Sequence, residues 1–393
     1  MKKILFIGDG PDVPSGFGKA TREILDVLRH SYDVTVLGIN ANGDRGTVPY
    51  DVYTCWPGGD LYGVGRLIWC CDKTKPDIIC IQQDGWNFQA YLQQLAQFPE
   101  YAKIPVVAIV AIDGKNFQGR WLDGVALAIF WTQFALDEAR EGGYKGAAVV
   151  IPLGVDLKTY YPIDKKVARK ARKIDSIGDM FIVGNVNRNQ PRKRWDLTLK
   201  YFAEWITSRK VNDAWLYLHT APTGERGVDV PRLARYYGVI HRLALIEPET
   251  FYGIPEEEMR ATYNCFDVCI STTQGEGMGL PAMEAMACGV PCILPDWSAY
   301  GDWAKDAALL VPCTSTAIGP PYQNVIGGVV DEQQFVKELD RLYRSKDLRE
   351  FHSEKGLLRI TESRFHWANI GGAYVKALEG MLHPQTLRLV ESV

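Results

Sequence analysis

The sequence predicts an α/β protein made of two Rossmann-like domains, each a doubly wound parallel sheet. Three observations lead to this expectation. The chain has 393 residues, more than one ordinary hydrophobic core accommodates. Short apolar runs alternate with helix-length amphipathic patterns along almost all of it, which is typical of βα units around parallel sheets. A segment rich in Pro, Gly and charge, IPLGVDLKTYYPIDKKVARKARK, interrupts this alternation near residue 155.

The first half opens on an apolar run that stops after Ile7, too short for the core of a signal peptide, and it therefore predicts a first strand. The next helix is clear because Ala20, Ile24, Val27 and Leu28 fall on one face. Further apolar runs complete the first sheet. Its strands are expected at residues 4–7, 34–39, 77–81, 105–112, 126–131 and 148–151.

The second half repeats the alternation, and from Asp331 its pattern becomes helical. Strands of the second sheet are expected at residues 180–186, 214–219, 243–246, 267–271, 291–294 and 308–311. We therefore divide the chain into an N-terminal Rossmann-like domain, a C-terminal Rossmann-like domain and a last helix that packs back towards the N-terminal domain. The boundaries are 1–155, 156–365 and 366–393.

Composition argues against several classes of protein. A formal net charge of -3 gives no strong overall field for nucleic acid or membranes, although Lys and Arg outnumber Asp and Glu between Lys158 and Lys210. No run approaches the ~18 apolar residues of a membrane span. Nine cysteines without a secretory signal indicate a reducing, cytoplasmic setting.

Four of the cysteines form two C-x3-C pairs, which leaves a zinc site as one interpretation. The favoured interpretation is that they are small buried thiols within strands and helices, so no metal site is expected. These are Cys265, Cys269, Cys288 and Cys292.

The stretch GEGMGLPAMEAMACGVP, residues 275–291, carries the clearest functional signal. An apolar strand precedes it, and Pro281 suits the first turn of a helix. The loop between them thus reaches a helix N-terminus at the carboxyl end of a parallel strand, where open α/β sheets bind ligands and backbone N–H groups suit a diphosphate. The loop residues are Gly277, Met278, Gly279 and Leu280.

Two carboxylates bracket this loop, Glu276 just before the helix and Glu284 about one turn inside it. A carboxylate accepts hydrogen bonds from hydroxyl groups and is a poor neighbour for a phosphate. We therefore expect hydroxyl-rich groups at both ends of a bound diphosphate, a sugar on one side and a ribose on the other.

With these residues in view, EGMGLPAMEAMACGVPCI resembles the E-x7-E signature of the retaining, GT-B fold glycosyltransferases of the group-1 (GT4) family. Nearly the whole chain follows the family's order, with SGFGKATREIL, VVIPLGVDLKTYYP and NRNQPRKRWDLTLKYFAEW as further matching segments. The resemblance implies the GT-B fold, two Rossmann-like domains facing across a cleft, with residues 1–155 as the acceptor-binding domain and residues 156–365 as the nucleotide-sugar-binding domain. It also implies that Glu284 binds the ribose, that Glu276 contacts the donor sugar and that the backbone between them holds the diphosphate.

Positive charge for the diphosphate is expected from NVNRNQPRKRW, which follows the predicted strand 180–186. The resemblance assigns Arg188 and Lys193 to this task, because Arg supplies a planar fork and Lys a point charge. Arg192 and Arg194 leave the register open by one residue.

The N-terminal loop GDGPDVPSGFGK offers a rival, dinucleotide-binding interpretation, but Val13 stands where the third glycine of that fingerprint belongs. The resemblance instead aligns Gly16 and Gly18 with the family's flexible loop at the donor phosphates. Where the family often has a histidine after the strand at 105–112, this chain has Asp113, which we expect to be a polar residue on the acceptor side. His219, which ends LYLHT, is expected to be a packed histidine rather than a catalyst.

The expected reaction is the retaining transfer of a hexose from a nucleotide-diphosphate sugar, preferably a UDP-sugar, to an unidentified hydroxyl acceptor. A D-x-D pair is absent from the sequence, which favours front-face displacement without a metal ion and with no cofactor besides the donor substrate. Glycan, lipid, protein and modified nucleobase acceptors, DNA included, all stay open. So do a sugar-nucleotide epimerase of the same fold and a non-catalytic nucleotide-sugar-binding protein.

Overall fold

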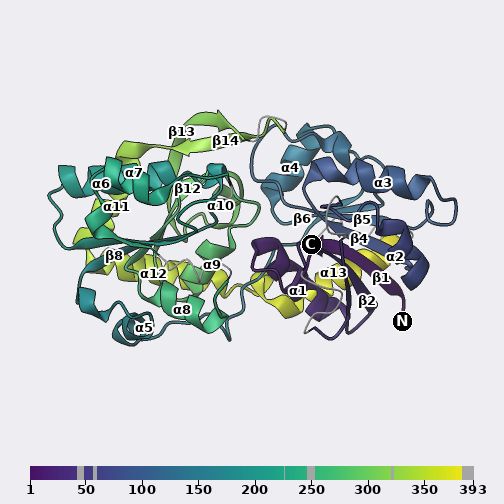
Figure 1. Cartoon of the computed structure of the whole chain (residues 1–393), viewed down its shortest axis with the longest axis horizontal. Coiled ribbons are helices and arrows are strands. Elements are labelled where there is room, and N and C mark those ends of the chain that lie inside the picture. The colour runs from purple at the N-terminus through teal and green to yellow at the C-terminus, as the bar shows by residue number, and fades with distance from the viewer. Residues whose placement is uncertain (42–47, 56–59, 225, 246–252, 320–322, 383–393) are drawn as a thin grey trace. The chain divides into compact units, whose positions relative to one another are not determined.

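The computed structural model describes residues 1–41, 48–55, 60–224, 226–245, 253–319 and 323–382 (Figure 1). The chain divides into two compact units. The first unit comprises Met1–Ile112, Asn116–Gly154 and Ser363–Val393, and the second comprises Asp113–Lys115 and Val155–Glu362.

The first unit is built on a parallel sheet whose described strands run in the order β3-β2-β1-β4-β5-β6-β7. All six predicted strands are present. The additional strand, β3, was not expected because only Val52 in it is fully buried, so it forms no apolar run. The strands are β1 (Lys3–Asp9), β2 (Asp33–Ile39), β3 (Asp51–Thr54), β4 (Ile78–Gln82), β5 (Val106–Val110), β6 (Leu127–Phe130) and β7 (Ala148–Val150).

Helices of the first unit include the last helix of the chain. In Figure 1 the yellow helix α13 lies beside the purple helix α1, where a Cβ on Gly371 would come within 2.6 Å of the Val27 side chain. Ile370, Tyr374 and Leu378 of this last helix are buried. The helices are α1 (Gly16–Leu28), α2 (Leu67–Thr74), α3 (Phe88–Ala96), α4 (Gln133–Glu141) and α13 (Trp367–Leu382). Residues 383–393 of the predicted terminal segment lie outside the described residues.

The second unit has a sheet whose described strands run in the order β10-β9-β8-β11-β12-β13-β14. The first six are parallel, but β14 pairs with β13 in the antiparallel direction, so the expectation of a wholly parallel sheet was wrong at this edge. The sequence IGGVV of β14 gave no signal because two glycines break its apolar run. The strands are β8 (Phe181–Val186), β9 (Ala214–His219), β10 (Leu243–Leu245), β11 (Val268–Ile270), β12 (Cys292–Asp296), β13 (Leu309–Ile318) and β14 (Ile326–Val330). Ile246, the last residue of the strand expected at 243–246, lies outside the described residues.

The helices of the second unit connect these strands. Because β8, β11 and β12 are neighbours in the sheet, the segments that follow them start from the same edge. The helices are α5 (Lys165–Ala171), α6 (Trp195–Ser208), α7 (Val230–Tyr236), α8 (Glu256–Asn264), α9 (Leu280–Ala287), α10 (Ser298–Trp303), α11 (Glu332–Arg344) and α12 (Lys346–Ile360).

The short segment Asp113–Lys115 adds to the second unit beside β14. Lys115 and Ile326 exchange two backbone hydrogen bonds, of 2.8 Å and 3.0 Å. The α/β class and the two Rossmann-like sheets are thus confirmed. In the described part of the chain, no helix combines the length and the apolar character needed to cross a bilayer.

Candidate active site

The loop between β11 and α9 is fixed by bonds to the segment that follows β8. The hydroxyls of Thr198 and Thr272 lie 2.6 Å apart, and the Gln274 N–H donates to the carbonyl of Arg192 at 2.8 Å. On its other side the Gln274 carbonyl accepts from Gly328 of β14 at 2.8 Å. Residues 271–279 are all buried, so the loop is a rigid part of the core.

Two glycines allow this loop to pack as closely as it does. A Cβ on Gly275 would lie 1.6 Å from the Asp113 carbonyl oxygen. Gly279 has φ +85°, and a Cβ there would also lie 2.3 Å from the Tyr300 ring. Both the backbone conformation and the close approach therefore require glycine at position 279.

The same loop presents a group of backbone donors. In the described part of the chain, no acceptor receives a hydrogen bond from the N–H groups of residues 277–280. They stand at the N-terminus of α9, where the helix dipole favours negative charge. Trp303 Nε1 donates a hydrogen bond to the Met278 carbonyl at 2.7 Å. The N–H of the same peptide, that of Gly279, therefore points in the opposite direction, away from Trp303. This arrangement suits an anion such as a diphosphate.

Glu276 stands directly before these donors, and its side chain is 7% exposed. Its carboxylate forms an ion pair with Lys193 and lies 3.4 Å from Arg192 Nη1. Its own N–H donates to the Ser298 hydroxyl at 2.9 Å. Burial alone would raise the pKa of the Glu276 carboxyl, but the charges of Lys193 and Arg192 outweigh that effect and hold the pKa below its ordinary value.

Lys193 is as buried as its partner, with 7% of its side chain exposed. Burial lowers the pKa of its ammonium group to about 8, and the charge of Arg192 acts in the same direction while Glu276 opposes it. Lys193 therefore carries its charge at neutral pH and loses it just above.

The other basic residues of the same segment take separate places. Arg188 follows β8 with an exposed side chain, and its carbonyl accepts from Trp195 Nε1 at 3.0 Å. Arg194, at φ +53°, turns back onto Asp196, 2.8 Å away. The structure thus brings Lys193 and Arg192 to Glu276. Arg192 belongs to the basic run seen in the sequence, but the sequence did not assign it to the site. Only the conformation of the turn after β8 decides which of these cations point inwards.

Glu284 lies about one turn inside α9 and is 7% exposed. Tyr263 of α8 donates its hydroxyl proton to Glu284 Oε2 at 2.6 Å. Burial and the carboxylate together raise the pKa of Tyr263 well above its ordinary value, so the phenol stays a donor. The carboxylate is therefore oriented by a fixed partner and has further acceptor capacity for ribose hydroxyls.

The remaining predicted residues lie in different parts of the fold. Asp113 belongs to the second unit, where its Oδ2 is 3.3 Å from Arg192 Nε. Gly16 and Gly18 begin α1 in the first unit, and the Ser15 hydroxyl caps this helix by accepting from Gly18 N–H at 2.9 Å. His219 is partly buried, and this burial lowers its pKa to about 4 and leaves it neutral.

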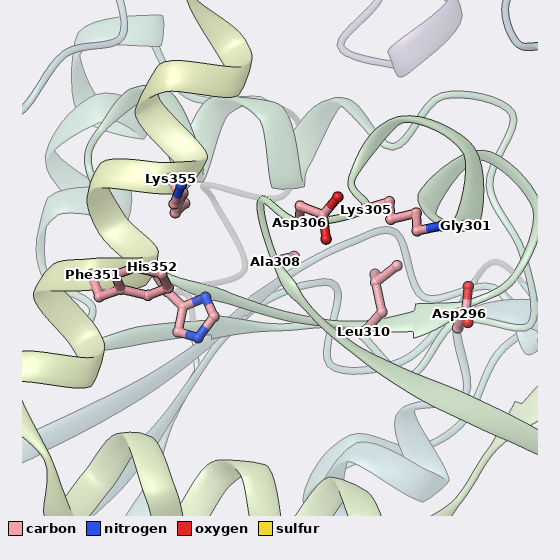
Figure 2. A pocket seen from close by; sticks show the side chains of 9 residues that line it. All are labelled: Asp296, Gly301, Lys305, Asp306, Ala308, Leu310, Phe351, His352 and Lys355. Atoms are coloured by element: carbon pink, nitrogen blue, oxygen red, sulfur yellow. The ribbon is translucent and has the colours of Figure 1, made fainter.

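A separate hollow of about 720 Å³ lies in the second unit between α12 and the start of β13 (Figure 2). It shares α10 with the candidate site, because Tyr300 and Trp303 contact the glycine loop while Gly301 lines the hollow. Its charged side chains are of both signs, unlike the cationic environment that a diphosphate needs. The lining residues are Asp296, Gly301, Lys305, Asp306, Ala308, Leu310, Phe351, His352 and Lys355.

The described residues include no metal site. In those residues, His, Cys, Asp and Glu form no group of three or more with the geometry of a metal site. None of the nine cysteines forms a disulfide, and the thiols of Cys265 and Cys292 donate to nearby backbone carbonyls.

Comparison with known proteins agrees with this geometry. Residues 179–344 match the family model described as glycosyl transferases group 1. A D-inositol 3-phosphate glycosyltransferase from Geodermatophilus obscurus is 32% identical over 168 residues, which cover 40% of this chain and 36% of the relative. One of the same name from Nocardia farcinica is 26% identical over 251 residues, covering 60% and 53%. The chain therefore spans about a third to a half of the length of these curated relatives.

Solved structures of similar fold cover nearly the whole chain. Sucrose-phosphate synthase from Thermosynechococcus elongatus aligns with a TM-score of 0.78 at 17% identity, covering 98% of this chain and 100% of the other. Anabaena HepE in complex with UDP-glucose aligns with a TM-score of 0.72 at 18% identity, covering 97% and 100%. At such identities the likeness shows the fold, which is that of these GT-B proteins. The family match lies within the second unit, where residues 179–344 are similar to the group 1 glycosyltransferases.

Proposed function

We propose that this chain is a retaining glycosyltransferase that moves a hexose from a UDP-sugar to a hydroxyl group of an acceptor. The observation that carries the proposal is the group of unpartnered N–H donors at residues 277–280, set between the buried carboxylates of Glu276 and Glu284. Donors for a diphosphate flanked by acceptors for hydroxyls are what a nucleotide-diphosphate sugar requires. UDP is preferred because the similar Anabaena structure holds UDP-glucose.

In the proposed reaction the bond between the sugar C1 and the diphosphate oxygen breaks while a bond from C1 to the acceptor oxygen forms on the same face. The acceptor proton passes to the departing diphosphate. This transfer needs no metal ion or other cofactor. Arg188, Lys193 and the loop amides stabilise the negative charge that develops on the leaving group, and this is the main catalytic contribution. The second unit would hold the donor and the first unit, with Gly16 and Gly18, would serve the acceptor and the donor phosphates.

The GT4 assignment and the retention of configuration rest on the E-x7-E resemblance. A reducing, cytoplasmic setting is supported by nine cysteines that form no disulfide with one another. Asp113 is proposed to contact the sugar or acceptor from within the second unit, because Arg192 directs its carboxylate towards the loop that carries Glu276.

The test is a thermal-shift screen of UDP-, GDP- and ADP-sugars followed by product analysis. A bound donor stabilises the folded chain by mass action. Lys193→Ala and Glu284→Ala should lose this stabilisation and all turnover, while Arg194→Ala, whose guanidinium faces Asp196, should keep both. Failure of every nucleotide sugar to stabilise the chain would refute the proposal.

The products distinguish the alternatives. Free nucleotide together with a glycoside, or with free sugar when no acceptor is added, identifies a transferase. An epimeric nucleotide sugar identifies an epimerase, and a donor that binds but stays intact with every acceptor class identifies a non-catalytic binding protein.

A further inference from the structure

The guanidinium of Arg192 connects three acceptors of the second unit. Its Nη1 donates to the Gly275 carbonyl at 2.8 Å and lies 3.4 Å from Oε2 of Glu276. Its Nε lies 3.3 Å from Oδ2 of Asp113. A planar cation with donors in fixed directions can hold two carboxylates at once, which an ammonium group does less well.

Glu276 thus has two cationic partners, and they differ in what else they contact. Among the ion pairs of the described residues, Lys193 takes part only in the one with Glu276. Arg192 is also held by Gly275 and Asp113, and its side chain is 32% exposed. Arg192 is therefore tethered independently of Glu276, whereas Lys193 is not.

This difference matters when a diphosphate arrives. A diphosphate attracts Lys193 away from Glu276, and a buried carboxylate left without a counter-ion is strongly unfavourable. With Lys193 as its sole partner, Glu276 would compete with the donor for the same charge. Arg192 removes the competition because its other contacts keep it beside Glu276 when Lys193 turns.

We propose that Arg192 is a positioning residue that remains the counter-ion of Glu276 while Lys193 engages the diphosphate, an inference that rests on the function proposed above. Arg192 also holds the carboxylates of Glu276 and Asp113 in fixed directions, so that both accept hydrogen bonds from sugar hydroxyls. Neither the E-x7-E spacing nor the pair Arg188 and Lys193 assigns this task.

The test uses UDP, which has no sugar, and the full chain in a double-mutant cycle at pH 6.5. Arg192→Gln should weaken UDP binding at least 10-fold, because Lys193 is then the only partner of Glu276. Glu276→Gln removes the competing carboxylate, so it should raise UDP affinity at least 10-fold more in the Arg192→Gln background than in the wild type. Isothermal titration calorimetry measures the four dissociation constants.

Two control variants separate positioning from general damage. Arg192→Lys keeps the positive charge and should retain part of the lost affinity. Arg194→Gln, which alters the neighbouring arginine that faces Asp196, should bind UDP as the wild type does and show no coupling to Glu276→Gln. Thermal unfolding of each variant verifies that it is folded.

The outcomes are distinct. Effects of Arg192→Gln and Glu276→Gln that simply add, or UDP binding that survives Arg192→Gln unchanged, overturn the inference while leaving the glycosyltransferase proposal in place. A wild-type chain that binds neither UDP nor any UDP-sugar refutes the proposed function itself.

Discussion

The ammonium of Lys193 and the carboxylate of Glu276 form a buried ion pair across 83 residues of sequence, with 7% of each side chain exposed. The pair joins the segment after β8 to the loop after β11, which are neighbouring strands. It places a cation of depressed pKa at Glu276, directly before the N–H donors of residues 277–280, which have no acceptor in the described part of the chain. This combination makes the electrostatics of the site sensitive to pH.

UDP affinity should fall as the pH rises through about 8, where Lys193 loses its proton. Losing a charged hydrogen bond to the diphosphate should weaken binding about 10- to 100-fold. Because Glu276 raises the pKa of Lys193, Glu276→Gln should move the fall to lower pH. Titration calorimetry between pH 6.5 and 9.5 measures the UDP affinity of the wild type and of Glu276→Gln.

Glu332→Gln is the matched control for that experiment. Glu332 pairs with Lys200 on the surface, at 2.6 Å, with 32% and 44% of the two side chains exposed. Removal of this surface carboxylate should leave unchanged the pH at which UDP affinity falls. An equal change of that pH in Glu332→Gln and Glu276→Gln would contradict the role of the Lys193–Glu276 pair.

Gly279→Ala should destabilise the fold and abolish UDP binding, because a Cβ would be 2.3 Å from the Tyr300 ring at φ +85°. Gly238→Ala is the control, since Gly238 has φ +75° with no atom within 4 Å of its Cβ position. The control should lose about 1 kcal/mol of unfolding free energy from backbone strain and keep UDP binding. Gly279→Ala should lose at least about 2 kcal/mol, as measured by urea unfolding. Equal losses would show that the ring contact is unimportant.

Glu284→Gln should remove the discrimination between UDP and 2′,3′-dideoxy-UDP. The wild type is expected to prefer UDP about 10- to 100-fold, because a carboxylate accepts hydrogen bonds from the ribose hydroxyls. Tyr263→Phe keeps the carboxylate but removes the hydroxyl that orients it at 2.6 Å, so a smaller loss is expected. A preference that persists in Glu284→Gln would place the ribose elsewhere.

His219 should affect stability at acidic pH and not the pH dependence of UDP binding between pH 6 and 8. Burial lowers its pKa from 6.5 to about 4 in the folded chain. Between these two pH values the unfolded chain binds more protons than the folded chain, so the free energy of unfolding falls as the pH decreases. The wild type should therefore lose about 2 kcal/mol relative to His219→Asn between pH 7 and pH 5. Urea unfolding at both pH values measures this, and a constant difference between the two proteins would disprove it.

Much of the fold could be predicted because parallel strands buried on both faces leave continuous apolar runs in the sequence. The strands that the sequence did not predict, β3 and β14, lie at sheet edges. In β3 burial is incomplete, and in β14 glycines interrupt the apolar run. The positions of Glu276, Glu284 and the glycine loop were likewise predictable, since they depend on spacing within one strand–loop–helix unit.

The sequence by itself determined that this chain has two α/β units and a glycine-containing loop between two carboxylates. Only the tertiary structure decided which cations serve that loop. Arg192, Lys193 and Arg194 are consecutive, yet the turn after β8 directs the first two to Glu276 and the third to Asp196. The reason is physical: a pattern of residue types records burial and spacing along the chain, whereas the direction of a side chain in a turn depends on the backbone angles that packing against the neighbouring loop imposes.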